Sequence, residues 1–195
     1  MKKRIGTIVV ILVLALGIIA LYWYIDRLDR EEIEPAGTVA EQVIARDLEK
    51  NYPPTPYAVA ELYCDIVKGI YDKNTTEKQL ETLVQMQLQM FDEEFAELNP
   101  YEELLEVTKE DLAEAAEKKI VFAGYVVDRA SNVEKWKSDS VEYASIQLQF
   151  ITTGGSGRGT ASRTLVMRRD ADKRYKILGW RTAEDGGGDS ENPGN

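Results

Sequence analysis

The longest apolar stretch of the chain stands at its beginning. Residues 5–25 hold no charged side chain, and three cations lie before them in residues 1–4. A helix of that length rises about 30 Å, which is the thickness of the hydrocarbon core of a bilayer. The pattern therefore predicts a transmembrane helix over residues 5–25, preceded by a short N-terminus at residues 1–4.

The charges around this segment predict its orientation. Three cations precede it, and the first acidic residue, Asp26, follows it. The positive-inside rule leaves the N-terminus in the cytoplasm and places the rest of the chain outside. A cleaved signal peptide is the alternative, because residues 15–17 offer a small-x-small cleavage site. Hydrophobic residues continue beyond that site, which favours a retained anchor. We therefore expect a single-pass protein of the cell membrane with an extracytoplasmic C-terminal domain.

Residues 26–55 link this segment to the remaining chain. They begin with a charged stretch and continue into a short helical pattern with Val39, Val43 and Leu48 on one side. Prolines then end the helix, because they donate no helix hydrogen bond and favour extended geometry. The pattern predicts a stalk helix and a Pro-rich, semi-rigid linker over residues 26–55.

Three amphipathic helical patterns come next. Thr55 is a suitable N-cap for the first, over residues 56–72, since proline follows it. Thr76 and Gln79 have the spacing of a capping box for the second, which we expect to end near Asn99. An Asn-Pro pair opens the third, which runs to about residue 117. We expect about three helices in this half of the domain.

The following half is typical of strands. Ala144, Ile146, Leu148 and Phe150 alternate with polar residues, as in an antiparallel sheet with one covered face. Glycine-rich and aspartate-rich turns predict hairpins between the later strands. Four runs are rich in β-branched and aromatic residues: 120–128, 140–153, 160–169 and 174–183. The sequence thus predicts an α+β domain over residues 56–182, with helices packed on a curved four-stranded antiparallel sheet, and a disordered tail over residues 183–195.

The last predicted strand carries a resemblance. RYKILGWR, from Arg174 to Arg181, follows a tight Asp-rich hairpin and resembles the closing strand of nuclear transport factor two-like cone domains. The apolar N-terminus, the junction DLEKNYPPTP and this domain together resemble a family of uncharacterised membrane-anchored proteins from Gram-positive anaerobes. The resemblance extends from Met1 to about Thr182. It implies a cone-like fold, and it lends no assigned activity.

Composition excludes most common catalytic designs. The chain has no histidine and one cysteine, Cys64. A histidine base, a Ser/His/Asp or Cys/His pair, a zinc site of His and Cys ligands and an internal disulfide are therefore excluded. Some cone domains resemble ketosteroid isomerases, and the residues that this likeness nominates are Asp65, Asp128, Tyr63 and Tyr125. None of them forms a motif of defined spacing, so we expect no enzyme, no cofactor and no metal site.

Charge is unevenly distributed. The 34 acidic residues all follow residue 25, whereas three of the 24 cations precede it, so the exported part has a net charge of −13. This balance argues against nucleic acid as a partner. Residues 158–181 nevertheless carry eight cations against two aspartates. They predict a basic interaction face, with a loop tryptophan as a second anchor: Arg163, Arg168, Arg169, Lys173, Arg174, Lys176, Arg181 and Trp136. The alternative is that these cations pair with the acidic helices of the same domain.

These observations favour an interaction module over an enzyme. The leading hypothesis is a scaffold domain at the cell surface that docks an acidic protein partner or a second copy of the chain. The alternative is binding of a small molecule or peptide in the cone, whose lining we expect to include Tyr63, Tyr125 and Trp180. An isomerase-like enzyme is the third hypothesis.

Overall fold

The computed structural model describes residues 37–154 and 157–182. The predicted N-terminus and transmembrane helix over residues 1–25 and the predicted tail lie outside the described residues. No helix within the described ranges combines the length and hydropathy needed to cross a bilayer.

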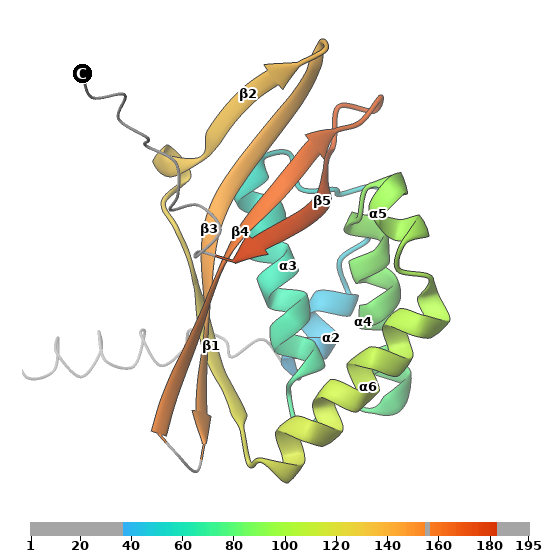
Figure 1. The fold of residues 1–195 in the computed structure, drawn as a ribbon. Coiled ribbons are helices and arrows are strands. Elements are labelled where there is room, and N and C mark those ends of the chain that lie inside the picture. Colours follow the sequence, from blue (N-terminus) through green and yellow to red (C-terminus); the bar gives the residue numbers. More distant parts are fainter. Residues whose placement is uncertain (1–36, 155–156, 183–195) are drawn as a thin grey trace, which may run out of the picture. The chain divides into compact units, whose positions relative to one another are not determined.

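Helices precede strands along the chain, and they gather on one side of a single sheet (Figure 1). The helices are α2 (Val39–Ile44), α3 (Pro56–Ile70), α4 (Glu77–Met90), α5 (Glu93–Glu97) and α6 (Tyr101–Glu117). The strands are β1 (Val121–Val127), β2 (Glu134–Ser138), β3 (Val141–Gly154), β4 (Gly157–Arg169) and β5 (Tyr175–Thr182), with a 3-10 turn η1 (Ala130–Asn132) between β1 and β2. The predicted α+β class is confirmed.

The sheet is antiparallel in the order β1-β3-β4-β5. β3 is long enough to pair with β1 along its second half and with β2 along its first half. Register shifts interrupt β1 next to Gly124 and the β4–β5 ladder next to Gly179. Both glycines have a φ of 152°, which other residues rarely adopt. These irregularities bend the sheet toward the helices.

Two features of the strands and helices differ from the prediction. The polar segment around Trp136 forms β2, whose five residues are all exposed and therefore show no buried alternation. Its hairpin turns at Asp139 and Ser140, both with positive φ, as a two-residue type I′ turn requires. The predicted second helix divides at Phe91 and Asp92: Phe91 is extended, and the Asp92 carboxylate accepts a hydrogen bond from the Glu94 amide at the start of α5.

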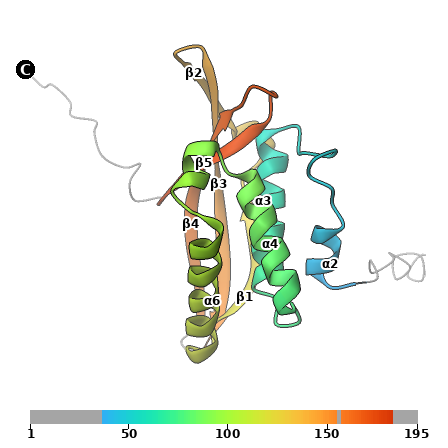
Figure 2. The same ribbon diagram turned by 90° about the vertical axis from the view of Figure 1, so that its right-hand side faces the viewer.

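The core lies between the sheet and α3, with α4 on the far side of α3. Ile146, Leu165 and Ile177 of the sheet are buried together with Ile66 of α3 and Leu83 of α4. Figure 2 views the helical side of the domain and shows α3 beside α4, with α6 set apart from α3. In contrast to α3 and α4, α6 has no buried residue. This helix therefore covers the sheet only loosely.

The predicted stalk and linker differ from the structure over residues 39–55. Ala40, Val43 and Leu48 are buried in the domain core, against α3 and α4. The hydroxyl of Tyr52 donates a 2.8 Å hydrogen bond to the Tyr175 carbonyl. A six-residue helix is marginal in water by itself, so α2 depends for its stability on the burial of its apolar side chains. The compact unit accordingly begins at Gly37, and the prediction of residue 56 as its start is corrected.

Cys64 gives a simple test of this packing. Its side chain is fully buried on α3, and burial raises the pKa of its thiol to about 12. Because the thiolate is the reactive form, we expect no labelling of the folded protein by a thiol reagent at mildly alkaline pH. In concentrated guanidinium the same sample should label fully. Rapid stoichiometric labelling without denaturant would contradict the core described here.

Candidate functional site

An open groove of about 550 Å³ lies between α6, α3 and the helix-facing side of the sheet. One wall comes from Leu104, Val107 and Ala115 of α6. The facing wall consists mostly of aromatic side chains from α3 and three strands: Tyr63, Tyr71, Phe122, Phe150 and Trp180. This volume lies within the range typical of ligand sites in proteins.

The position of α6 creates the groove. The helix begins after Pro100 and packs chiefly on α4, where Lys109 forms a 2.8 Å ion pair with Glu77. Its apolar residues Leu104 and Leu112 are only partly covered, and Val107 is 52% exposed. An apolar helix face that is not buried within the domain is available to another molecule.

The aromatic wall is a connected set of rings. Trp180 lies 6.3 Å from Tyr63 and meets the edge of Phe95 at 5.4 Å, measured between ring centroids. Phe122 bridges Tyr71 and Phe150 at 5.9 and 5.8 Å. These contacts fix the rings, yet Trp180 remains 43% exposed. A rigid, partly exposed aromatic wall suits binding, because ordering it costs little entropy on association.

The charged residues that line the groove are two carboxylates and one lysine, Lys118. Asp111 and Glu114 line it from α6, and Glu114 is paired with Lys118. Burial raises the pKa of the Tyr63 hydroxyl, which Gln87 hydrogen-bonds, so that this group stays neutral. The groove is therefore mainly apolar, and its charged rim carries one more carboxylate than lysine.

The predicted cavity residues divide between two sites. Tyr63 and Trp180 line the groove. Tyr125 lies in a separate pocket of about 350 Å³, where its hydroxyl donates a 2.6 Å hydrogen bond to Asp65. Arg46 binds the same carboxylate at 3.2 Å. This triad joins the segment after α2 to α3 and β1.

The residues nominated for isomerase-like chemistry are not assembled in one cavity. Desolvation and the bonded Asp65 carboxylate raise the pKa of Tyr125. Asp128 lies at the end of β1, where the Asn132 amide donates to it and lowers its pKa. Tyr63 lines the groove, while Tyr125 and Asp65 line the other pocket. No substrate in a single cavity would meet all four.

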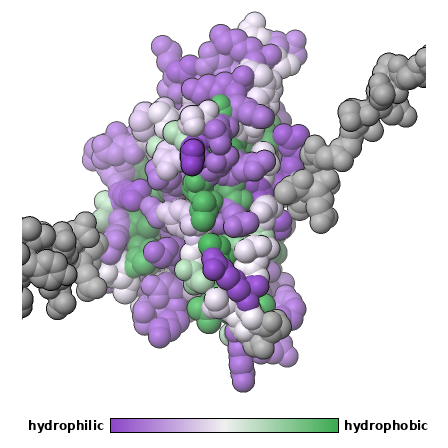
Figure 3. Space-filling view, turned by 90° about the vertical axis from the view of Figure 1, so that its left-hand side faces the viewer, coloured by the Kyte–Doolittle hydropathy of each residue, from purple (hydrophilic) through white to green (hydrophobic). Residues whose placement is uncertain are grey.

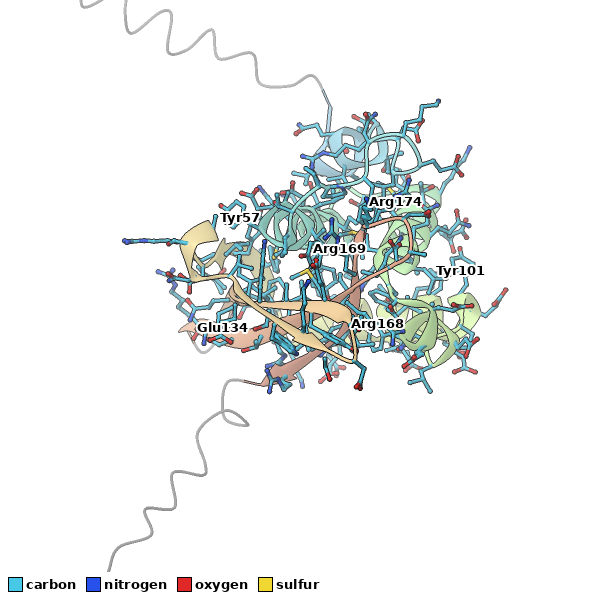
Figure 4. The ribbon with its side chains drawn as sticks, turned by 90° about the horizontal axis from the view of Figure 1, so that it is seen from above. Tyr57, Tyr101, Glu134, Arg168, Arg169 and Arg174 are labelled. Carbon is cyan, nitrogen blue, oxygen red and sulfur yellow. The ribbon has the colours of Figure 1, made fainter. Side chains whose placement is uncertain are left out.

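The strongest cation contacts of the predicted basic face are internal. Arg168 forms a two-point bond to Asp92, with Nε–Oδ2 at 3.0 Å and Nη2–Oδ1 at 2.5 Å, and also reaches Glu94 at 2.9 Å. These carboxylates raise the pKa of Arg168. Arg169 binds Glu142 at 2.5 Å. Figure 4 shows Arg168, Arg169 and Arg174 at the same end of the domain.

The remaining members of the predicted face vary in exposure. Arg174 donates to the Glu49 carbonyl, and Lys176 donates to the Gln89 carbonyl over the Tyr52 ring. Arg163 is half-buried and bonds the Ser162 carbonyl. Lys173 and Arg181 are exposed, and Trp136 is stacked on a neighbouring ring and 40% exposed. Arg168 thus pairs with the acidic helix α5, whereas Arg169 pairs with Glu142 on strand β3.

The sequence did not reveal most of the groove. Tyr71, Phe122, Phe150 and Val107 had no signal that separates a groove residue from a core residue, because both occupy apolar positions of the same periodicity. The acidity of α6 was the one available indication. Seven of the 17 residues of this helix are Asp or Glu, which limits how much of its surface can be buried.

The comparisons with known proteins identify the family of the chain but assign it no activity. A family model described as a domain of unknown function (DUF6715) matches residues 1–180. Among solved structures, the intermembrane space region of the chloroplast protein ARC6 matches with 12% identity and a TM-score of 0.31, over 67% of this chain and 98% of that chain. No curated protein sequence matches the chain significantly. The expected resemblance to an uncharacterised family is confirmed at this level.

Proposed function

The chain belongs to the DUF6715 family, whose function is unknown, and we propose that its domain is a protein-interaction module. In this proposal the groove between α6 and the sheet holds an apolar segment of a partner protein. One observation carries it: α6 buries no residue of its own, although it faces a wall of aromatic rings.

The exposed apolar side chains support this location. Val107, Ile120 and Trp180 are 52%, 41% and 43% exposed, and all three line the groove. The sheet face that the helices leave uncovered is mostly hydrophilic, with only a narrow apolar strip (Figure 3). Aromatic residues in well-packed pockets provide much of the binding energy in protein interfaces. The groove is therefore a better docking site than the open sheet.

Charge indicates the kind of segment that fits. α6 carries seven carboxylates and one lysine, and Asp111 and Glu114 stand at the rim. A segment with Lys or Arg beside its apolar residues would complement this rim, and like-charged segments would be disfavoured. An acidic partner on the basic face is less favoured, because Arg168 is already paired with both Asp92 and Glu94 within the domain.

The setting of the domain is part of the same proposal. The uncharged run over residues 5–25 supports a membrane anchor, and the charges that flank it support an extracytoplasmic domain. The helices on a bent antiparallel sheet support a cone-like class. The dispersal of the isomerase-like nominees over separate sites supports a binding role in place of catalysis.

Site-specific photo-cross-linking in intact cells tests this function. A photoreactive residue at Val107 should capture a discrete partner, and the same residue at the exposed Ala113 of α6 should not. Ala115→Phe fills the groove and should lower the yield at least about 10-fold, which corresponds to about 1.4 kcal/mol. Ala113→Phe is the matched control, since it adds the same ring outside the groove.

The identity of the captured segment decides between the candidates. A cross-linked peptide with apolar residues beside lysines or arginines would support the proposal. Equal yields from both positions, or a yield that Ala115→Phe leaves unchanged, would refute it. Adducts only with small molecules would favour the alternative of a small-molecule site in the groove.

A further inference from the structure

A second pocket, of about 600 Å³, lies between residues 54–56, the β2–β3 hairpin and the start of β5. Seen from above, Arg169 lies between this hairpin and the helices (Figure 4). The pocket shares no lining residue with the groove. It is therefore independent of the function proposed above.

The pocket is cationic, although the chain as a whole is acidic. Lys135, Lys137 and Arg169 line it, and Glu142 is the one carboxylate that does so. Glu142 contacts both Lys137, at 3.1 Å, and Arg169, at 2.5 Å. Among the described residues Lys135 has no ion-pair partner, and its Nζ lies 5.9 Å from the centre of the Tyr175 ring. One carboxylate cannot neutralise three cations, so the pocket keeps a charge of about +2.

Aromatic rings complete the pocket. The buried Tyr175 ring lies under Lys135 and also under Arg169, whose guanidinium carbon is 5.6 Å from the ring centre. Trp136 stacks on Tyr143 with the two planes 11° apart, and it remains 40% exposed at the pocket wall. The pocket therefore places the flat aromatic ring of Trp136 beside its cationic side chains.

From this combination we propose that the pocket binds a soluble phosphate monoester carried on a ring. The dianionic phosphate matches the residual charge of the pocket and lies against the Lys135 ammonium, while Arg169, which already donates Nη1 to Glu142 and Nε to the Lys173 carbonyl, adds positive charge nearby. The ring of the ligand stacks on Trp136. A carboxylate ligand would carry half the charge of the phosphate dianion and would therefore match the pocket less well. An anionic membrane is disfavoured, because the exported chain with its net charge of −13 is repelled by such a surface.

Calorimetric titration of the full chain in a neutral detergent tests this site, with inorganic phosphate and phenyl phosphate as probes. Phenyl phosphate should bind more tightly than inorganic phosphate or benzoate. Lys135→Ala should weaken both phosphate probes at least about 5-fold, because it removes a direct charge contact. Lys78→Ala is the matched control, since it removes an exposed lysine from α4, outside this pocket. Trp136→Ala should weaken phenyl phosphate and leave inorganic phosphate unchanged.

Each contrary result has a clear meaning. No saturable binding of phenyl phosphate at millimolar concentration, or equal losses in Lys135→Ala and Lys78→Ala, would overturn the site. Binding to vesicles that contain phosphatidic acid, without binding of the soluble ester, would assign the pocket to a lipid head group and overturn the proposed ligand. Circular dichroism of each variant shows whether a loss of binding comes from unfolding.

Discussion

Replacing Arg168 with alanine is expected to lower the free energy of unfolding by about 1.5–3 kcal/mol, the typical contribution of hydrogen bonds to a charged group. The Asp92 side chain is only 6% exposed, and Arg168 gives it two hydrogen bonds. Without the guanidinium, that carboxylate keeps the hydrogen bond from the Glu94 amide at the start of α5 but loses its countercharge. Urea unfolding followed by circular dichroism measures the loss.

Arg181→Ala is the matched control for this prediction. Arg181 is an exposed arginine on β5, and among the described residues it forms no ion pair. Its replacement should change the stability by less than about 0.5 kcal/mol. If Arg168→Ala costs no more than Arg181→Ala, the ion pair with Asp92 does not stabilise the domain and Arg168 becomes available as a docking residue.

The second large effect concerns where the folded domain begins. A chain of residues 37–182 should unfold cooperatively, whereas a chain of residues 56–182 should be destabilised by more than about 4 kcal/mol. The shorter chain loses the burial of Val43 and Leu48, each worth about 1.5–3 kcal/mol, and the hydrogen bond from Tyr52 to the Tyr175 carbonyl. Thermal melts of the two chains make the comparison.

A point variant separates loss of packing from loss of chain length. Val43→Asp within residues 37–182 should be destabilised like the shorter chain, because it places a charge in the core. Ala45 is an exposed neighbour at the end of α2, and Ala45→Asp should have a small effect. Equal melting temperatures for the 37–182 and 56–182 chains would restore the stalk that the sequence suggested.

Local signals predicted the order of elements well. Thr76 and Gln79 form the capping box that their spacing suggests, and Thr55 caps the helix that opens with Pro56. Alternation in β3 places Ile146 and Leu148 in the core. In these places short-range chemistry and tertiary packing favour the same conformation, so the sequence alone was sufficient.

Elements that depend on a distant partner could not be predicted in the same way. β2 depends on its pairing with β3. All five of its residues are exposed, so core packing does not hold the strand in place. Phe91 leaves the helix to form a bridge with Ile177, some 86 residues away in the sequence. The stripe with Val43 indicated an apolar face but not what covers it. An amphipathic pattern shows that one face of an element is buried, but it does not identify the element that packs against that face.

The candidate site followed the same rule. Tyr63 and Trp180 were expected to line a cavity and do line the groove, but Tyr125 points to Asp65 in another pocket. The basic segment was visible in the sequence, while its pairing with Asp92 and Glu142 required the fold. Whether α6 closes on the sheet or stands away from it is a matter of tertiary packing that no local pattern encodes.

The most direct test of the central claim is the accessibility of the groove in the folded domain. In a 37–182 chain with Trp136→Phe, Trp180 is the one remaining tryptophan and serves as an internal reporter. A neutral apolar fluorophore should bind at one site per chain and quench Trp180, with binding lost in Ala115→Phe and kept in Ala113→Phe. A Trp180 emission that neither the fluorophore nor a neutral quencher alters would mean that α6 lies closed on the sheet, and it would contradict the open groove.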